Sequence, residues 1–250
     1  MRRLCLFAAA LILVSCSPPQ QKAKKPDGFK EITFETADQR TVYADFYPAL
    51  EPNSEKVILM FHQANSNAGE YEGPALTAIT LGYNCIALDQ RAGGEMWGRT
   101  NRTTTKGGTG EYMDAYKDME AALDYCHTHN YTTILVWGSS YSASLAFKLA
   151  TEDSTIKAVI AFSPGEYLED PHIVKSWAQK TTVPTFFACT EGELGDGRQD
   201  LFNALHTDKK VLACFNGGVH GTSTLLPEKS EAAGKYMEQL KLFITGLKKE

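Results

Sequence analysis

Residues 133–150 constrain the fold of this chain more than any other stretch. They begin with the apolar run TILVW at residues 133–137, which has the length and composition of a buried strand. The short segment GSSYS follows at residues 138–142, and apolar residues then recur at helical spacing through residues 143–150. We therefore expect a strand that turns sharply into a helix, with a serine at the corner.

Steric demand selects which serine stands at that corner. A nucleophile on a sharp strand-to-helix turn has a strained backbone, so the residues two before and two after it must be small. Ser140 meets this condition, because Gly138 precedes it and Ser142 follows it. Ser139 has a tryptophan and a tyrosine at these places, and Ser142 lies too far beyond the strand. Ser140 is thus the candidate nucleophile, and the alternative is a serine-rich N-cap after a buried strand.

The rest of the chain alternates between strand-like and helix-like segments. Residues 29–48 alternate between apolar and polar side chains around a polar turn, which predicts an antiparallel hairpin. Further strands are expected at residues 56–61, 84–89, 156–162, 184–189 and 210–215, and helices at residues 69–81, 111–127, 198–205 and 227–247. This order indicates a mostly parallel sheet covered on both faces, with ligands at the carboxyl ends of its strands. Residues 92–110 lack a clear period, so we expect a long loop over that end.

The first residues have the pattern of an export signal. Two arginines precede an apolar run of about a dozen residues, which is too short to span a bilayer. The sequence LVSC at residues 13–16 resembles a bacterial lipobox, and this resemblance implies that Cys16 is lipidated and begins the mature protein. We expect a signal peptide at residues 1–15, a polar tether at residues 16–28 and one domain at residues 29–250. The alternative is an ordinary signal peptide, with Cys16 incidental.

Composition excludes some classes of partner. Without the two signal arginines, residues 16–250 carry 23 cations against 30 acids, a net charge of −7. This balance argues against nucleic-acid binding and against a basic membrane patch. No CxxC or HExxH pattern occurs, so we expect neither a metal nor a cofactor. Four cysteines of the expected domain lie in apolar or helical runs, where we expect free, buried thiols: Cys85, Cys126, Cys189 and Cys214.

A serine nucleophile requires a base and an acid that orients the base. His220 lies in the glycine-rich segment GGVHG directly after the last expected strand, and it is the candidate base. The acid is expected after the strand that ends near residue 189. Glu193, four residues beyond that strand end, is favoured, with Asp196 as the main rival and Asp170 as a distant third.

The oxyanion of an acyl-transfer intermediate requires two backbone N–H donors. One should belong to Tyr141, the residue after the candidate nucleophile. The other should come from the loop after residues 56–61, where we expect Gln63 to be the donor. His62 on the same loop is then a shaping residue and not the base.

Four motifs of this chain together resemble those of the α/β-hydrolase superfamily, of the dienelactone-hydrolase-like or serine esterase type: HQANSNAGEY, ALDQRAGG, GSSYS and GGVHG. The resemblance implies an α/β-hydrolase fold with a mostly parallel eight-stranded sheet and a small cap built from about residues 166–180. It also implies a triad of Ser140, Glu193 and His220 in that order. The chain departs from the family at Ser142, where glycine is usual, and in its glutamate, where aspartate is commoner.

These observations favour a lipid-anchored serine hydrolase that cleaves carboxylic esters of small molecules. The anchor at Cys16 would attach it to a bacterial membrane, on the periplasmic or cell-surface side. Two alternatives are an inactive binding lipoprotein that keeps the fold, and a serine peptidase on the same fold. The sequence leaves the acyl and alcohol parts of the ester and the oligomeric state open.

Overall fold

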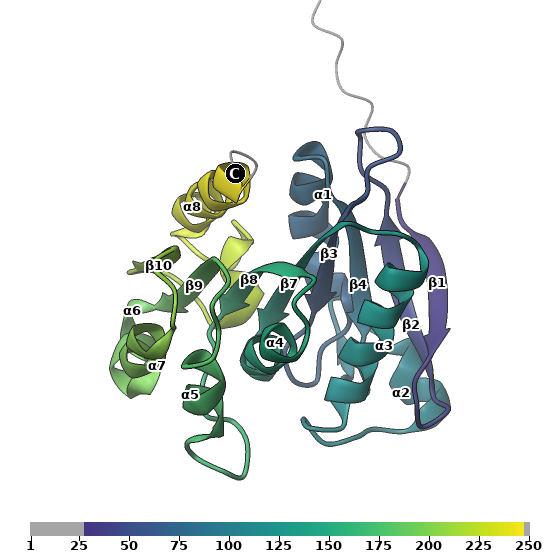
Figure 1. Cartoon of the computed structure of the whole chain (residues 1–250), viewed down its shortest axis with the longest axis horizontal. Coiled ribbons are helices and arrows are strands. Elements are labelled where there is room, and N and C mark those ends of the chain that lie inside the picture. Colours follow the sequence, from purple (N-terminus) through teal and green to yellow (C-terminus); the bar gives the residue numbers. More distant parts are fainter. Residues whose placement is uncertain (1–27, 248–250) are drawn as a thin grey trace, which may run out of the picture.

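An eight-stranded sheet runs through the molecule in a computed structural model that describes residues 28–247 (Figure 1). Its order is β1-β2-β4-β3-β7-β8-β9-β10. The strands are β1 (Lys30–Glu35), β2 (Thr41–Tyr47), β3 (Lys56–Phe61), β4 (Asn84–Asp89), β7 (Thr133–Ser139), β8 (Ile156–Phe162), β9 (Thr185–Thr190) and β10 (Lys210–Phe215). The hairpin of β1 and β2 is antiparallel, and β2 pairs antiparallel with β4. The remaining strands of this sheet run parallel to one another, in the order β4, β3, β7, β8, β9 and β10. The expected mostly parallel sheet is therefore confirmed.

Helices cover both faces of this sheet (Figure 1). One face packs against α3, α4, α5 and α7, and the other packs against α1 and α8. Their bounds are α1 (Glu72–Thr80), α3 (Ala115–Thr128), α4 (Tyr141–Glu152), α5 (Ile173–Ala178), α7 (Gln199–Ala204) and α8 (Ala233–Gly246). Strands β3, β4 and β7 are almost wholly buried, as continuous apolar runs between two helical layers should be.

Four short segments lie between these elements at the ends of the parallel strands. A 3₁₀ helix, η1 (Ala68–Tyr71), follows β3, and α6 (Glu191–Glu193) with the π-helical turn η2 (Leu194–Arg198) follows β9. A second 3₁₀ helix, η3 (Gly221–Leu225), follows β10 and precedes α8. The closing helix therefore begins six residues later than the sequence predicts. Because the strands run parallel, the loops after β3, β4, β7, β8, β9 and β10 all meet at one edge of the sheet.

Residues 92–110 are more ordered than the sequence predicts. They contain the small hairpin of β5 (Glu95–Met96) and β6 (Arg99–Thr100), followed by α2 (Arg102–Gly107). Arg99 and Arg102 both pair with the buried carboxylate of Asp45, at 2.7 Å each, and Arg102 also pairs with Asp89 at 2.6 Å. These ion pairs attach the segment to β2 and β4.

The four cysteines of the domain differ in burial. Cys85, Cys126 and Cys189 are buried, but Cys214 is half-buried because β10 is an edge strand. Cys189 and Cys214 are partners in the register of β9 and β10.

Between residues 28 and 247, no helix combines the length and the apolar character needed to cross a bilayer. The predicted signal peptide, Cys16 and all but the last residue of the tether lie outside the described residues.

Candidate active site

The corner between β7 and α4 holds Ser140 in a left-handed conformation, with φ 59° and ψ −126°. This geometry carries the side chain out of the sheet edge at the first turn of the helix. A Cβ at Gly138 would lie 2.4 Å from the Ala143 nitrogen and 2.4 Å from the Ser142 oxygen. Only glycine fits at residue 138, as the steric argument from the sequence requires.

Ser142 stands where glycine is usual, and its hydroxyl explains the change. Ser142 Oγ lies 2.7 Å from the His62 carbonyl oxygen and 2.9 Å from Gln90 Oε1. The side chain is fully buried. It therefore connects the corner of β7 to the loops that leave β3 and β4.

His220 lies between Ser140 and Glu193. His220 Nε2 is 2.9 Å from Ser140 Oγ, and His220 Nδ1 is 2.5 Å from Glu193 Oε1. The histidine side chain is 42% exposed, the glutamate side chain is 15% exposed, and Ser140 is 7% exposed. The structure thus brings the three sequence-predicted residues into one hydrogen-bonded chain that solvent reaches through the imidazole.

Glu193 is held by a network that the sequence did not reveal. Glu193 Oε2 accepts from Thr190 N at 2.9 Å, within a capping box that begins α6, and from Ser163 Oγ at 2.8 Å. Burial alone would raise the pKa of Glu193, but the hydrogen bonds from His220, Thr190 and Ser163 outweigh it and lower the pKa to about 2. The carboxylate is therefore ionised at any ordinary pH.

The loop that carries His220 is positioned from the same side. Gly221 N donates to Ser163 Oγ at 2.9 Å, and Thr222 N donates to Ser139 Oγ at 2.9 Å. A Cβ at Gly221, whose φ is +70°, would lie 2.5 Å from Ser139 Oγ. Ser139 and Ser163 thus place the base against the nucleophile and the acid.

The two rival acids lie elsewhere. The Asp196 side chain is 73% exposed, and its nearest ionic partner is Arg198 at 3.7 Å. Asp170 is exposed on the loop before α5, where Oδ1 accepts from His172 N at 2.9 Å. Neither carboxylate contacts the imidazole of His220 within the described chain.

The structure contradicts Gln63 as an oxyanion donor. Gln63 N donates to Glu70 Oε2 at 3.0 Å, and Glu70 is a buried residue of η1. The next amide on this loop, Ala64 N, has no acceptor within residues 28–247. Tyr141 N begins α4, where helix geometry supplies no intrahelical acceptor. The two N–H groups free to bind an anion are therefore those of Ala64 and Tyr141.

His62 is fully buried and its ring serves the backbone. Gln90 N donates to His62 Nε2 at 2.9 Å, so Nδ1 carries the proton and donates to the Gln63 oxygen at 2.7 Å. Burial lowers the pKa of His62, which keeps the ring neutral. This arrangement fits the shaping role that the sequence predicts for His62.

Tyr167 adds an aromatic wall to the site. Tyr167 Oη donates to the Ser163 oxygen at 2.8 Å and accepts from Arg198 Nη2 at 2.8 Å. Its ring meets the His220 ring edge-on, with 6.5 Å between the ring centroids. Trp177 of α5 is buried in the hydrophobic core. Within the described chain, no group of three acidic, histidine or cysteine side chains is arranged to hold a metal ion.

Comparison with solved structures identifies the fold. An esterase of Pyrococcus furiosus superposes with a TM-score of 0.64 at 19% identity, covering 86% of this chain and 93% of that one. A dienelactone hydrolase from Anabaena variabilis gives 0.65 at 14% identity over 89% and 97% of the two chains. A cold-adapted esterase from an Arctic intertidal metagenomic library gives 0.65 at 21% identity over the same shares. The chain has the α/β-hydrolase fold.

Comparison of sequences gives a partial match. No family model matches the chain. An acyltransferase of Aspergillus calidoustus is 29% identical over 139 residues, which are 54% of this chain and 43% of that protein. The match spans less than half of the acyltransferase.

Proposed function

We propose that this protein is a serine hydrolase that cleaves carboxylic esters through an acyl-enzyme on Ser140. The observation that carries the proposal is the position of His220, whose two ring nitrogens lie 2.9 Å from Ser140 Oγ and 2.5 Å from Glu193 Oε1. A base that contacts both a serine nucleophile and an ionised acid is the arrangement that acyl transfer requires. The esterases and the dienelactone hydrolase of the same fold agree with this chemistry.

In the proposed reaction, Ser140 Oγ attacks the ester carbonyl carbon while His220 Nε2 takes the hydroxyl proton. Glu193 stabilises the imidazolium through Nδ1–H. Collapse of the tetrahedral intermediate breaks the bond to the alcohol oxygen, which receives the proton from Nε2. Water, activated by the neutral imidazole, then releases the acid and restores Ser140.

The oxyanion of each tetrahedral intermediate would bind to Ala64 N and Tyr141 N. Neither amide has an acceptor among residues 28–247; one lies on the loop after β3 and the other at the start of α4. Backbone donors fixed in advance stabilise the developing negative charge without reorganisation. Glu70 supports this arrangement indirectly, since it holds the preceding amide of Gln63.

Two alternatives predict different behaviour. A binding protein that has lost activity would not need a connected chain of Ser140, His220 and Glu193. A peptidase on the same fold would cleave amides. An acyltransferase, as the partial sequence match suggests, would pass the acyl group from Ser140 to an acceptor other than water. Attachment to a membrane through Cys16 remains part of the proposal and rests on the sequence alone.

Labelling with a fluorophosphonate tests the proposal directly. The wild-type protein should take up one equivalent on Ser140, identified by peptide mapping, and should hydrolyse short-chain aryl esters. Ser140→Ala should abolish labelling and lower kcat by a factor on the order of 10⁴ to 10⁶. Ser54→Ala is the control, because Ser54 caps the turn before β3, with its hydroxyl 2.6 Å from the Gly82 oxygen. A wild type that neither labels nor cleaves esters would favour the binding protein.

A further inference from the structure

A hollow of about 450 Å³ is lined in part by Tyr167, whose ring faces His220. Two segments line it: the residues that lead into α3, with Glu111, Tyr112 and Met113, and the loop after β8, with Tyr167, Glu169 and Asp170. Figure 1 shows both segments at the same end of the molecule, at the lower edge of the view. We call this space the acidic hollow.

Two of its walls lie next to residues of the proposed active site. The Tyr167 ring meets the His220 ring edge-on, with 6.5 Å between the ring centroids. The Tyr112 ring stacks at 4.5 Å on Tyr141, the residue after the nucleophile. The hollow is therefore separated from His220 and from Tyr141 by one aromatic side chain each.

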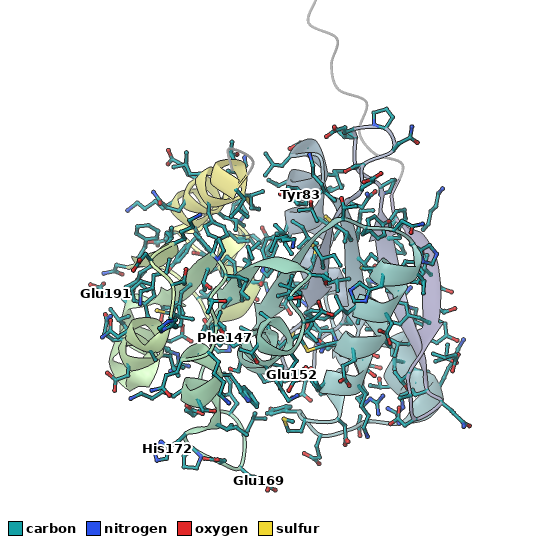
Figure 2. The ribbon with its side chains drawn as sticks, viewed as in Figure 1. Tyr83, Phe147, Glu152, Glu169, His172 and Glu191 are labelled. Carbon is teal, nitrogen blue, oxygen red and sulfur yellow. The ribbon has the colours of Figure 1, made fainter. Side chains whose placement is uncertain are left out.

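The interior of the hollow is apolar and aromatic, but its charged residues have one sign. Tyr112, Tyr167 and three aliphatic or thioether side chains make up the apolar part. Glu111, Glu169 and Asp170 are exposed at the rim, and no lysine or arginine lines the space. Figure 2 shows Glu169 near the tip of the loop before α5.

The buried cation Arg198 does not offset these acids. Arg198 donates to the Tyr167 hydroxyl and lies 3.7 Å from Glu193. It does not line the hollow. A carboxylate placed in the hollow would face three like charges while losing water, whereas a cation would be attracted by the acids and by the tyrosine rings.

We infer that the acidic hollow binds the alcohol part of the ester and selects alcohols that carry an apolar cationic group, such as a quaternary ammonium, over alcohols that carry a carboxylate. The alcohol part is assigned because His220 Nε2 must protonate the leaving oxygen, and Tyr167 lies beside that imidazole. This inference rests on the proposed esterase function. Esters whose alcohol part carries a carboxylate, which a site lined by basic residues would accept, are then poor substrates.

Three butyrate esters that differ only at the alcohol end test the inference. They are butyrylcholine, its neutral isostere 3,3-dimethylbutyl butyrate, and 3-carboxypropyl butyrate, each followed by proton release in a pH-stat. We expect kcat/KM to fall in the order cationic, neutral, anionic, with about tenfold or more between the first and the last. Raising the salt concentration should narrow this difference.

A double variant assigns the effect to the hollow. Glu169→Gln with Asp170→Asn should lower the ratio of kcat/KM for butyrylcholine to that for the neutral ester on the order of fivefold, because two attractive charges are lost. It should leave the neutral ester unchanged. Asp208→Asn with Glu238→Gln removes the same net charge from exposed residues outside the hollow and should not change the ratio.

The outcomes separate the two proposals. If the neutral ester is cleaved in a Ser140-dependent way but the cationic and anionic esters are cleaved equally well, the inference is wrong and the esterase stands. An equal change of the ratio in the control variant also rejects the inference. If none of the three esters is cleaved and no fluorophosphonate is bound, the esterase function itself fails.

Discussion

Glu193 carries the negative charge that stabilises the protonated form of His220, the proposed base. Glu193→Gln keeps the shape and an acceptor for His220 Nδ1–H but removes the charge that stabilises the imidazolium. We expect kcat to fall on the order of 10³- to 10⁴-fold, less than for loss of the serine. Substrate binding and the thermal midpoint of unfolding should change little by comparison. Steady-state kinetics and a melting curve measure both.

The matched control for this prediction is Asp196→Asn. Asp196 lies three residues further along, with a side chain 73% exposed and 3.7 Å from Arg198. Its removal should leave kcat within about twofold, as for most exposed substitutions. A large loss for Asp196→Asn and a small one for Glu193→Gln would overturn the assignment of the acid.

His220 and Glu193 together determine how activity depends on pH. Only the neutral imidazole of His220 accepts the serine proton, so kcat/KM should rise as the pH is raised from acidic values. Glu193 has its pKa lowered to about 2, so it stays ionised throughout this rise. The acidic limb should therefore change by roughly tenfold per pH unit, the slope of one ionisation. A limb that changes by about a hundredfold per unit would show that a second group titrates with it.

The proposed triad and the amide of Tyr141 could be predicted from single positions, but the second proposed oxyanion donor could not. Ser140 and His220 follow from neighbouring glycines and from the order of strands, which are local signals. Gln63 was predicted as a donor because it follows β3. Its amide is instead bound by Glu70, a buried carboxylate seven residues away whose role depends on the folding of η1. A charged residue within a short helical turn gives no sequence signal that it will be buried.

At the scale of elements, apolar runs predicted the sheet well because the central parallel strands are buried on both faces. The hairpin of β5 and β6 was missed for the opposite reason. Its two strands are two residues each, and the segment is attached by Arg99 and Arg102 to Asp45 of β2, more than fifty residues earlier. The spacing of apolar residues in a sequence indicates packing that recurs at regular intervals. Isolated ion pairs such as these leave no regular spacing.

The corner between β7 and α4 gives the prediction at this scale. Gly138→Ala would place a Cβ 2.4 Å from backbone atoms of Ser142 and Ala143, which cannot move without shifting α4. We expect the free energy of unfolding to fall by about 1–3 kcal/mol, and ester hydrolysis to be lost. Urea unfolding measures the first and ester hydrolysis the second.

Gly234→Ala is the control for this substitution. Gly234 lies in α8, and a Cβ there meets nothing within 4 Å. Alanine should be neutral or should stabilise the protein by up to about 1 kcal/mol, because it favours the helix and restricts the unfolded chain. Equal destabilisation by both substitutions would show that the corner is not as tightly packed as the structure indicates.

At the scale of the whole molecule, the site is assembled from six loops at one edge of the sheet. The loops after β3, β7, β8, β9 and β10 supply Ala64, Ser140, Tyr167, Glu193 and His220, and the loop after β4 leads to the residues lining the acidic hollow. These residues are separated by up to about 150 positions in the sequence. Parallel topology makes their meeting predictable, because every strand ends at the same edge. The charge of the hollow was not predictable, since its acids come from two loops without regular structure.

The last prediction concerns the attachment of the molecule to a membrane. The expected mature chain has a net charge of −7, and three lysines follow Cys16 within ten residues: Lys22, Lys24 and Lys25. Charge alone therefore gives weak adsorption to an acidic bilayer, which high salt removes. If Cys16 carries lipid, the wild type should remain in the membrane fraction after a high-salt wash, and Cys16→Ala should move to the soluble fraction with its esterase activity intact. Cys85→Ala is the control, since Cys85 is buried in β4 and should not change partitioning. Detergent-phase partitioning that is the same for wild type and Cys16→Ala would reject the lipid anchor and leave the proposed chemistry of Ser140 untouched.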